Sequence, residues 1–226
     1  MRIPLTSYGL SIILAGSVLL LGGVVAAAFA FWPAAPVLGL LWLGLLAFFR
    51  DPERRAECGA DDLLSAADGI VRDVEDVRAP AFLEGRCRRI GVFMSVLDVH
   101  VNRSPANGVV RWVSHHPGSF RDARSETAKL ANEHNFVGLE LEGGRKVLVN
   151  QIAGLLARRI VCAACEGDRL ARGQRFGMVR FGSRVEIYLP LADRYEVRVR
   201  PGDRVWSGRT VIASWIGRAN ASPPSA

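Results

Sequence analysis

The chain has 226 residues, half of them hydrophobic, and a formal net charge of +7. This length allows one soluble domain plus a membrane segment, because typical domains run to about 100–200 residues. A basic surplus suits nucleic acid, an anionic membrane surface or an acidic substrate. The sequence has no zinc-finger spacing, RNA-binding aromatic motif or basic helix, so we expect no nucleic-acid partner.

The first 50 residues are the most apolar part of the chain, and residues 10–49 contain no charged side chain. The run Ser7–Trp32 is long enough to cross a bilayer as a helix, which takes about 20 residues. A second apolar run, Val37–Phe49, begins after Pro33 and Pro36, which interrupt the helix. We therefore predict a membrane-anchoring helical hairpin over residues 1–50. Whether residues 37–49 cross the bilayer stays open.

Basic residues flank this hairpin on both sides. Arg2 precedes it, Arg50, Arg54 and Arg55 follow it, and the turn between the two runs carries no charge. Under the positive-inside rule, both ends of the hairpin then face the cytoplasm. We expect a protein of the cell membrane whose second domain lies on the cytoplasmic side.

Residues 51–226 are predicted to form a mainly β domain. Apolar runs are short, several alternate with polar residues, and glycines separate them, as in half-buried strands. A short helix is expected around Ser125–Asn132. The strand-like runs are Arg89–Val96, Lys146–Ile152, Met178–Phe181, Val185–Leu189 and Tyr195–Val199.

This domain contains two internal sequence repeats, which we call echoes. The segment Ser65–Val74 resembles Ser104–Val113, and Gly167–Gly173 resembles Gly202–Gly208. Gly-Asp and Asn-Gly pairs between apolar residues are tight-turn signals, because Gly and Asn tolerate positive φ. The echoes indicate duplicated turn-and-strand units in a sandwich or a barrel–sandwich hybrid.

The first echo places Asp68 and Asn107 at matching positions. If Asp68 only shaped a turn, either residue would serve. A carboxylate adds a charge and a proton acceptor that the amide lacks. Asp68 is therefore a candidate for chemistry.

The cysteines give a weaker signal. The spacing of Cys162 and Cys165 suits a metal or a redox pair, but a zinc site usually needs a second pair or nearby histidines. We expect no metal site, and we expect these cysteines to pack as small apolar residues inside strands.

The segment Gly177–Pro190 contains the pair Gly182–Ser183 between strand-like runs. It resembles the processing site of phosphatidylserine decarboxylases, close to the short, archaeal-type form of that family. A lone Gly-Ser pair is a worthless signal, but five further landmarks of the family precede it in the right order, and the resemblance covers about residues 48–213. They are Phe48–Pro52, Ser65–Gly69, Asp98–Pro105, His116–Phe120 and Asn132–Asn135.

The resemblance implies a proenzyme that cuts itself. The Ser183 hydroxyl would attack the carbonyl of Gly182, where a glycine minimises crowding. Elimination and hydrolysis would leave a large chain, 1–182, and a small chain, 183–226, that begins with a pyruvoyl group. This covalent cofactor would form a Schiff base with phosphatidylserine, release CO2 and yield phosphatidylethanolamine, which makes the protein a carboxy-lyase.

The resemblance also implies roles for other residues. Asp68 and His100 are the candidates to assist Ser183. Longer family members carry two histidines three residues apart, whereas this chain has His100 and then Arg103, so which base activates Ser183 stays open. His116 is a reserve candidate, because the following Pro-Gly turn can aim it at a pocket. Arg103 is read as either a strand-end surface charge or a binder of the lipid phosphate.

The expected partners are phosphatidylserine, the membrane and the two chains of one precursor, and paired membrane helices are compatible with a homodimer. Two alternatives remain. One is a noncatalytic β domain tethered to the membrane. The other is a pyruvoyl decarboxylase of a soluble amino acid, against which the membrane hairpin argues, because a soluble substrate needs no anchor.

Overall fold

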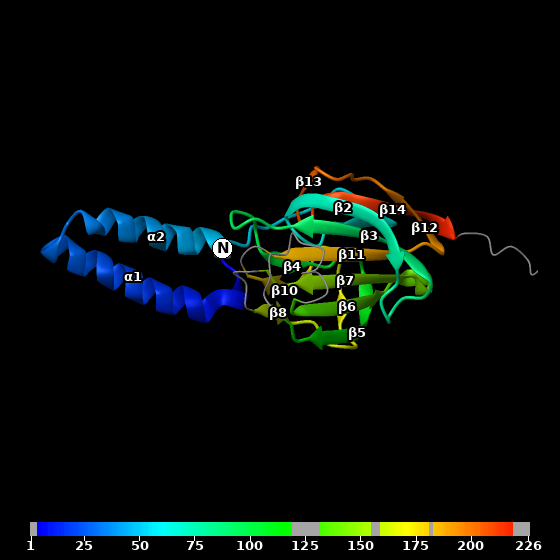
Figure 1. Ribbon diagram of the computed structural model, residues 1–226, viewed down its shortest axis with the longest axis horizontal. Helices are drawn as coiled ribbons and strands as arrows, with labels where there is room; N and C mark the ends of the chain where they lie inside the picture. The colour runs from blue at the N-terminus through cyan, green and yellow to red at the C-terminus, as the bar shows by residue number, and fades with distance from the viewer. Residues whose placement is uncertain (1–3, 119–131, 155–158, 181–182, 219–226) are drawn as a thin grey trace, which may run out of the picture. The chain divides into compact units, whose positions relative to one another are not determined.

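Figure 1 shows the computed structural model of the chain, which describes residues 4–118, 132–154, 159–180 and 183–218. The chain divides into two compact units, Met1–Glu53 and Arg54–Ala226. We describe each unit by itself.

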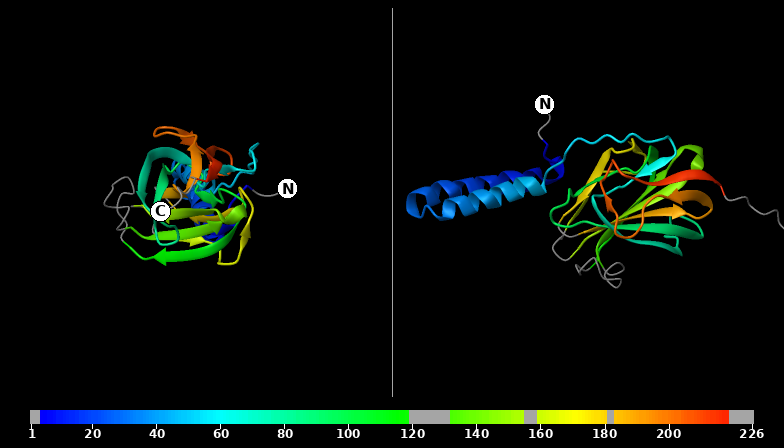
Figure 2. Two further views of the ribbon diagram at one scale, coloured as in Figure 1. Left: turned by 90° about the vertical axis from the view of Figure 1, so that its right-hand side faces the viewer. Right: turned by 90° about the horizontal axis from the view of Figure 1, so that it is seen from above.

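The first unit is a hairpin of two helices that run side by side (Figures 1 and 2). A side-chain hydrogen bond joins them, from Trp42 Nε1 to Ser17 Oγ at 3.0 Å. Gly16 allows close approach, since a Cβ at this position would lie 2.6 Å from the Leu45 side chain. The predicted hairpin is confirmed. Its helices are η1 Ser7–Gly9, α1 Leu10–Ala30 and α2 Ala34–Phe48.

The first helical segment has the properties of a membrane span. Ser7–Ala30 comprises 24 residues with a mean hydropathy of 2.5, which is long and apolar enough to cross a bilayer. Its large apolar side chains are exposed, among them Val18 at 77%, Leu19 at 76% and Phe29 at 91%. A helix packed on a water-soluble core would be apolar on one face only. With 15 residues, α2 is shorter than a typical span.

The second unit is built from antiparallel strands, joined in three sheets. One sheet has eight strands in the order β13-β2-β3-β11-β7-β6-β5-β9, and two have three strands each, β1-β14-β12 and β4-β10-β8. The strands are β1 Asp62–Leu64, β2 Gly69–Arg78, β3 Arg86–Phe93, β4 Val101–Arg103, β5 Gly108–His116, β6 His134–Glu140, β7 Lys146–Ile152, β8 Ile160–Cys162, β9 Arg169–Leu170, β10 Arg175–Val179, β11 Arg184–Pro190, β12 Asp193–Val197, β13 Arg204–Val205 and β14 Val211–Arg218. A short 3-10 turn, η2 Glu142–Gly144, precedes β7.

The main core lies between the large sheet and the two small ones. It joins Val149 and Ile187 of the large sheet to Phe176 and Ile212 of the small sheets, all buried. Side chains alternate along each strand, so the residues before and after each core residue lie on the other face of the sheet. The sheet curls around this core (Figure 2). The prediction of a mainly β, sandwich-like domain is confirmed.

The strands repeat in two matched sets, with the second set inserted into the first. In the large sheet, β13-β2-β3-β11 on one side of the centre corresponds to β9-β5-β6-β7 on the other. The small sheets match in the same way, β1-β14-β12 with β4-β10-β8. We call β1–β3 with β11–β14 the first copy and β4–β10 the second copy. The second copy thus interrupts the first between β3 and β11.

The turns that produced the sequence echoes are equivalent down to single hydrogen bonds. The Ser65 hydroxyl donates to the Ala67 carbonyl at 2.7 Å, and the Ser104 hydroxyl donates to the Ala106 carbonyl at the same distance. The echoes therefore mark a true structural duplication.

Most predicted strands are present with shifted ends. Met178 and Val179 of the predicted Met178–Phe181 run are the end of β10, which begins earlier, at Arg175, and the predicted Tyr195–Val199 run corresponds to β12, which begins at Asp193 and ends at Val197. The helix expected around 125–132 falls outside the described residues except for Asn132. Cys162 is half-buried on β8, but Cys165 is exposed in the following turn, so the expected packing inside a strand is wrong for Cys165.

Candidate active site

Ser183 lies immediately before β11 and is completely buried. Its carbonyl oxygen accepts a hydrogen bond from the Met94 N–H at 2.8 Å. Its hydroxyl donates to Met94 Sδ at 3.5 Å. A thioether is a weak acceptor, so the hydroxyl can turn to a stronger one at little cost. Gly182 lies outside the described residues.

His100 lies immediately before β4 and is also completely buried. Its carbonyl accepts from the Val179 N–H at 3.3 Å, which extends the ladder between β4 and β10. Its Nδ1 is 2.9 Å from the Asp98 carbonyl oxygen. Because a carbonyl only accepts, Nδ1 carries the proton, and the neutral ring has its lone pair on Nε2. Nε2 is therefore the atom that can act as a base.

The strand registers place His100 and Ser183 around one interior space. Gln151 Nε2 donates to Asn102 Oδ1 at 2.8 Å, so these two side chains meet between the large sheet and the sheet of β4. Gln151 pairs with Val185 across β7 and β11. His100 is two residues before Asn102, and Ser183 is two residues before Val185. By the period of two along a strand, both face the same interior as these partners.

Asp98 fixes the loop that carries His100. One carboxylate oxygen accepts from the Ser95 N–H and the Ser95 hydroxyl, both at 2.8 Å. The other oxygen accepts from the Arg204 guanidinium at 2.5 Å. The loop is therefore held on both sides while its backbone carbonyl orients the His100 ring. The sequence reasoning missed this residue, although its position two before His100 was a usable signal.

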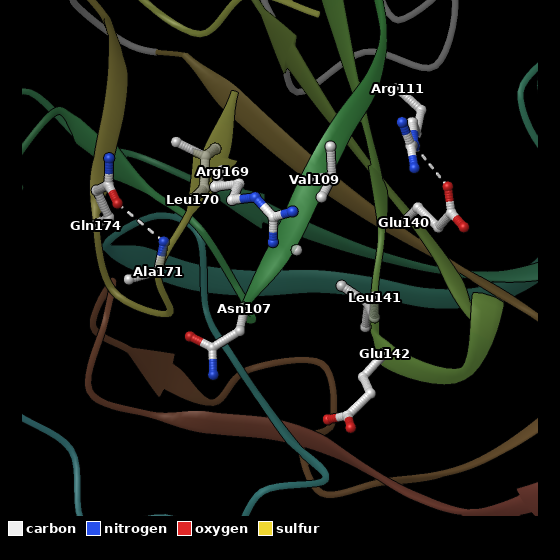
Figure 3. A pocket seen from close by; sticks show the side chains of 11 residues that line it. Asn107, Val109, Arg111, Glu140, Leu141, Glu142, Arg169, Leu170, Ala171 and Gln174 are labelled. Atoms are coloured by element: carbon white, nitrogen blue, oxygen red, sulfur yellow. Dashed lines mark hydrogen bonds and ion pairs between the residues drawn. The ribbon is translucent and has the colours of Figure 1, made fainter. Parts of the chain in front are cut away.

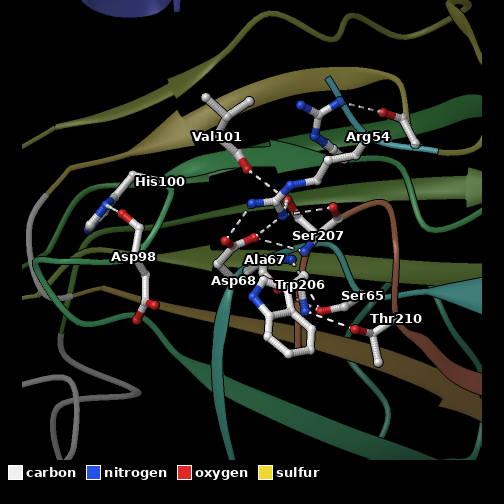
Figure 4. A network of polar contacts seen from close by, with 12 residues as sticks. Arg54, Ser65, Ala67, Asp68, Asp98, His100, Val101, Trp206, Ser207 and Thr210 are labelled. Atoms are coloured by element: carbon white, nitrogen blue, oxygen red, sulfur yellow. Dashed lines mark hydrogen bonds and ion pairs between the residues drawn. The ribbon is translucent and has the colours of Figure 1, made fainter. Parts of the chain in front are cut away.

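Asp68 lies in a different set of contacts (Figure 4). Its Oδ1 accepts from the Ser207 N–H at 2.8 Å, and the Arg54 guanidinium binds both carboxylate oxygens, with Oδ2 at 2.7 Å from Nη2. Both side chains of this ion pair are at most 10% exposed. The Asp68 charge is thus neutralised by Arg54, which no local sequence pattern marks as its partner.

The second copy makes the matching hydrogen bond, from a backbone N–H to a side-chain oxygen, without a carboxylate. There the Arg172 N–H donates to Asn107 Oδ1, also at 2.8 Å. An amide oxygen therefore suffices for the turn. The additional feature of Asp68 is its charge, and that charge binds Arg54.

The two reserve candidates differ in their surroundings. Arg103 is 2% exposed and its Nη1 donates to the Gly173 carbonyl at 3.2 Å, so the reading as a surface charge is wrong. His116 is exposed, stacks on His134 with ring centroids 4.7 Å apart, and lies 3.0 Å from the Ser114 hydroxyl. Desolvation, with the nearby His134 and His115, lowers the pKa of His116 below its ordinary value.

Arg184, the residue after Ser183, is a further site residue that the sequence reasoning did not identify. It is 2% exposed and crosses to the outer face of the sheet. There its Nε donates to Glu186 at 2.8 Å and its Nη2 donates to both oxygens of Asp73 at 2.6 and 2.7 Å. Burial lowers the pKa of Arg184, but Glu186 and Asp73 outweigh that effect and hold the pKa above its ordinary value. This cation therefore anchors the first residue of β11.

The second copy has no nucleophile at the position of Ser183. The Leu141 N–H donates to the Arg145 carbonyl at 2.7 Å, as the Met94 N–H does to Ser183, so Arg145 is the counterpart of Ser183. The Asn107 side of this copy opens on a pocket of about 540 Å³ that is also lined by Glu140 and Arg169 (Figure 3). The hydroxyl belongs to one copy only.

Comparisons with known proteins agree with this arrangement. The phosphatidylserine decarboxylase family model matches residues 44–213. The chain belongs to the phosphatidylserine decarboxylase family. It is thus a member of a family of carboxy-lyases, and the predicted enzyme class is confirmed.

Several relatives are named phosphatidylserine decarboxylase proenzyme. The protein from Symbiobacterium thermophilum is 50% identical over 188 residues, which cover 83% of this chain and 86% of the relative. The protein from Nitrosomonas europaea is 44% identical, with 81% and 84% covered. The one from Ralstonia nicotianae is 46% identical, with 77% and 80% covered. The word proenzyme in these names indicates a precursor that is processed.

Proposed function

We propose that this chain cleaves itself between Gly182 and Ser183 and then decarboxylates phosphatidylserine with a pyruvoyl group formed from Ser183. The observation that carries the proposal is the burial of both His100 and Ser183, on strands whose registers turn the two side chains to the same interior. A buried histidine whose Nε2 carries the lone pair is suited to take a proton from a serine hydroxyl.

In the proposed cleavage, the Ser183 oxygen attacks the carbonyl carbon of Gly182 and the peptide bond becomes an ester. Removal of the Ser183 α-proton then expels the Gly182 carboxylate, which ends the large chain. The dehydroalanine that remains takes up water and loses ammonia, which leaves the ketone. His100 Nε2 is the proposed acceptor of the hydroxyl proton. Asp68, paired with Arg54, assists by fixing the Ser207 turn, whose hydroxyl donates to the Val101 carbonyl of β4 at 3.4 Å.

The residues around Ser183 fit a pyruvoyl group. The group has the three carbon atoms of serine, so the buried space that holds Ser183 is large enough for it. The Met94 N–H that bonds the Ser183 carbonyl at 2.8 Å would hold the same carbonyl after cleavage. Once formed, the ketone supplies an electron sink for the bond that breaks when CO2 leaves. His100 is the proposed proton carrier on the substrate side.

The first unit suggests how a lipid substrate is reached. Its exposed apolar helices support anchoring in a membrane, and the basic residues Arg50 and Arg55 support a catalytic unit on the cytoplasmic side. This anchoring favours phosphatidylserine over a soluble amino acid as the substrate.

Mass spectrometry of purified wild-type and Ser183→Ala protein tests the proposal. The wild type should separate into two chains under denaturing conditions, the smaller blocked at its N-terminus by a ketone. Ser183→Ala should stay intact and release no CO2 from phosphatidylserine. Processing of Ser183→Ala, or an intact wild-type chain, contradicts the assignment. Parallel assays with phosphatidylserine and free serine distinguish the lipid substrate from a soluble one.

A further inference from the structure

A second polar pocket lies where the matching turns of the two copies meet. It has a volume of about 430 Å³, and its lining includes Arg54, Arg55 and Arg172 together with Gly173 and Gly208. Among the residues that the structure describes, none of those that line the pocket carries a carboxylate. We call it the arginine pocket.

Two of the three guanidinium groups are held in place by the fold. Arg172 Nη1 donates to the Asp62 carbonyl at 3.1 Å and contacts Cys58 Sγ at 3.2 Å. Arg54 donates to the Ser207 carbonyl at 3.0 Å as well as to Asp68. A guanidinium has more N–H donors than these contacts use. Arg172 donates to the Gly59 carbonyl as well, and to the Ala60 carbonyl at 3.5 Å, so its guanidinium is oriented by the fold before any ligand binds. The N–H groups that these contacts leave over are the donors that we assign to a ligand.

The charges around the pocket do not cancel. Asp68 neutralises Arg54, but Arg55 and Arg172 add two positive charges to the lining. A concave cationic site focuses its field on the space within. Arginine forks match the geometry of phosphate oxygens.

The chain connectivity suggests the source of the phosphate. Arg55 follows the end of α2 by seven residues, and a chain of that length spans at most about 25 Å. On the proposed membrane anchoring, phospholipid headgroups are the most concentrated phosphates within reach of this length of chain. From the charge, the oriented donors and this tether, we infer that the arginine pocket binds the phosphate of an anionic phospholipid headgroup.

This pocket is separate from the site at Ser183. Its lining contains neither Ser183 nor Met94 nor His100, and it meets the proposed chemistry only through the Arg54–Asp68 pair. Binding is therefore expected in uncut Ser183→Ala protein. A failure of binding can then be told apart from a failure of the proposed processing.

Isothermal titration of full-length Ser183→Ala protein in nonionic micelles tests the inference. The probe is dihexanoylphosphatidylglycerol, whose headgroup has no amine. Dihexanoylphosphatidylcholine and inorganic phosphate are the comparison ligands. Arg55→Gln should weaken binding of the phosphatidylglycerol about tenfold, the scale of one charge-assisted hydrogen bond. Arg55→Lys should recover part of that loss, because it restores the charge without the fork.

Arg194→Gln is the matched control, since Arg194 is exposed on β12 and its loss removes the same charge. Arg172→Gln should match Arg55→Gln, provided that its circular dichroism is unchanged. Binding that survives Arg55→Gln, or that falls equally with Arg194→Gln, overturns the inference. So does the absence of binding for every ligand. If inorganic phosphate binds as tightly as the phosphatidylglycerol, the pocket is a phosphate site, but the inference that its ligand is a lipid headgroup is overturned.

Discussion

Gly91 on β3 allows Arg184 to reach Asp73, and replacing it with alanine should break the anchor of β11. A Cβ at position 91 would lie 1.9 Å from Arg184 Nη2, 2.5 Å from its Cζ and 2.8 Å from Asp73 Oδ1. The Arg184 side chain is 2% exposed and is held by Asp73 and Glu186, so moving it aside breaks these ion pairs. The variant Gly91→Ala therefore displaces a buried cation.

The expected size follows from two opposing terms. Breaking a buried ion pair costs about 3–5 kcal/mol. Alanine regains about 0.5–1 kcal/mol over glycine within a strand. The net loss of about 2–4.5 kcal/mol corresponds to a fall in Tm of about 4–18 °C, at about 2–4 °C per kcal/mol for a domain of this size. Since Arg184 follows Ser183 directly, the displaced anchor should also slow processing.

Thermal denaturation followed by circular dichroism measures the first effect, in a Ser183→Ala background so that one intact chain unfolds. Gel electrophoresis over time measures the second in the otherwise wild-type chain. Gly59→Ala is the control, because a Cβ there would lie 3.4 Å from its nearest neighbour, an ordinary contact. A Gly91→Ala protein with the Tm and the processing rate of the wild type would refute the anchoring role of Arg184.

Three further predictions concern other residues. Asp68→Asn should keep the Ser207 turn, because Asn107 keeps the matching turn of the second copy. It should slow maturation at least tenfold, because it weakens the pair with Arg54 by about 1.5–3 kcal/mol, the contribution of one charged hydrogen bond. Time-resolved electrophoresis measures the maturation rate, and an unfolded variant contradicts the prediction. His100→Gln should preserve the fold yet abolish decarboxylation, measured as CO2 release. Burial raises the pKa of Cys87 to about 11, so at pH 8 only about one Cys87 thiol in a thousand is ionised. A thiol reagent should therefore modify the exposed Cys165 before Cys87. Equally rapid modification of Cys87 and Cys165 in the folded protein counts against the burial of Cys87.

The sequence was sufficient for features that depend on local pattern. The apolar hairpin follows from hydropathy and two prolines, and the duplication follows from turn residues whose side chains bond to nearby backbone. The contacts of Asp68 did not follow, because Arg54 lies in a charged run after the hairpin and nothing local marks it as a partner. Arg103 was misjudged in the same way, since its burial depends on Gly173 and Gly208, which are distant in sequence and adjacent in space.

Arg184 shows a related limit. A charged residue in an alternating strand is normally assigned to solvent, and the alternation did place it on the outer face correctly. It is buried because Asp73 and Glu186 neutralise it there and because Gly91 leaves the space. Such a pairing between strands is set by register, which a single sequence does not reveal.

The central position of β11 changes the order of the refolding reaction. This strand pairs with β3 on one side and β7 on the other, so both copies of the fold close on it. The uncut chain refolds in a first-order reaction. After the proposed cleavage, β11–β14 belong to a separate polypeptide, and recovery from the unfolded state becomes second order. Dilution should then hinder refolding of the mature protein but leave the precursor unaffected. The mature protein would consequently owe its persistence to slow unfolding, since a chain pair that has come apart at low concentration rarely meets again.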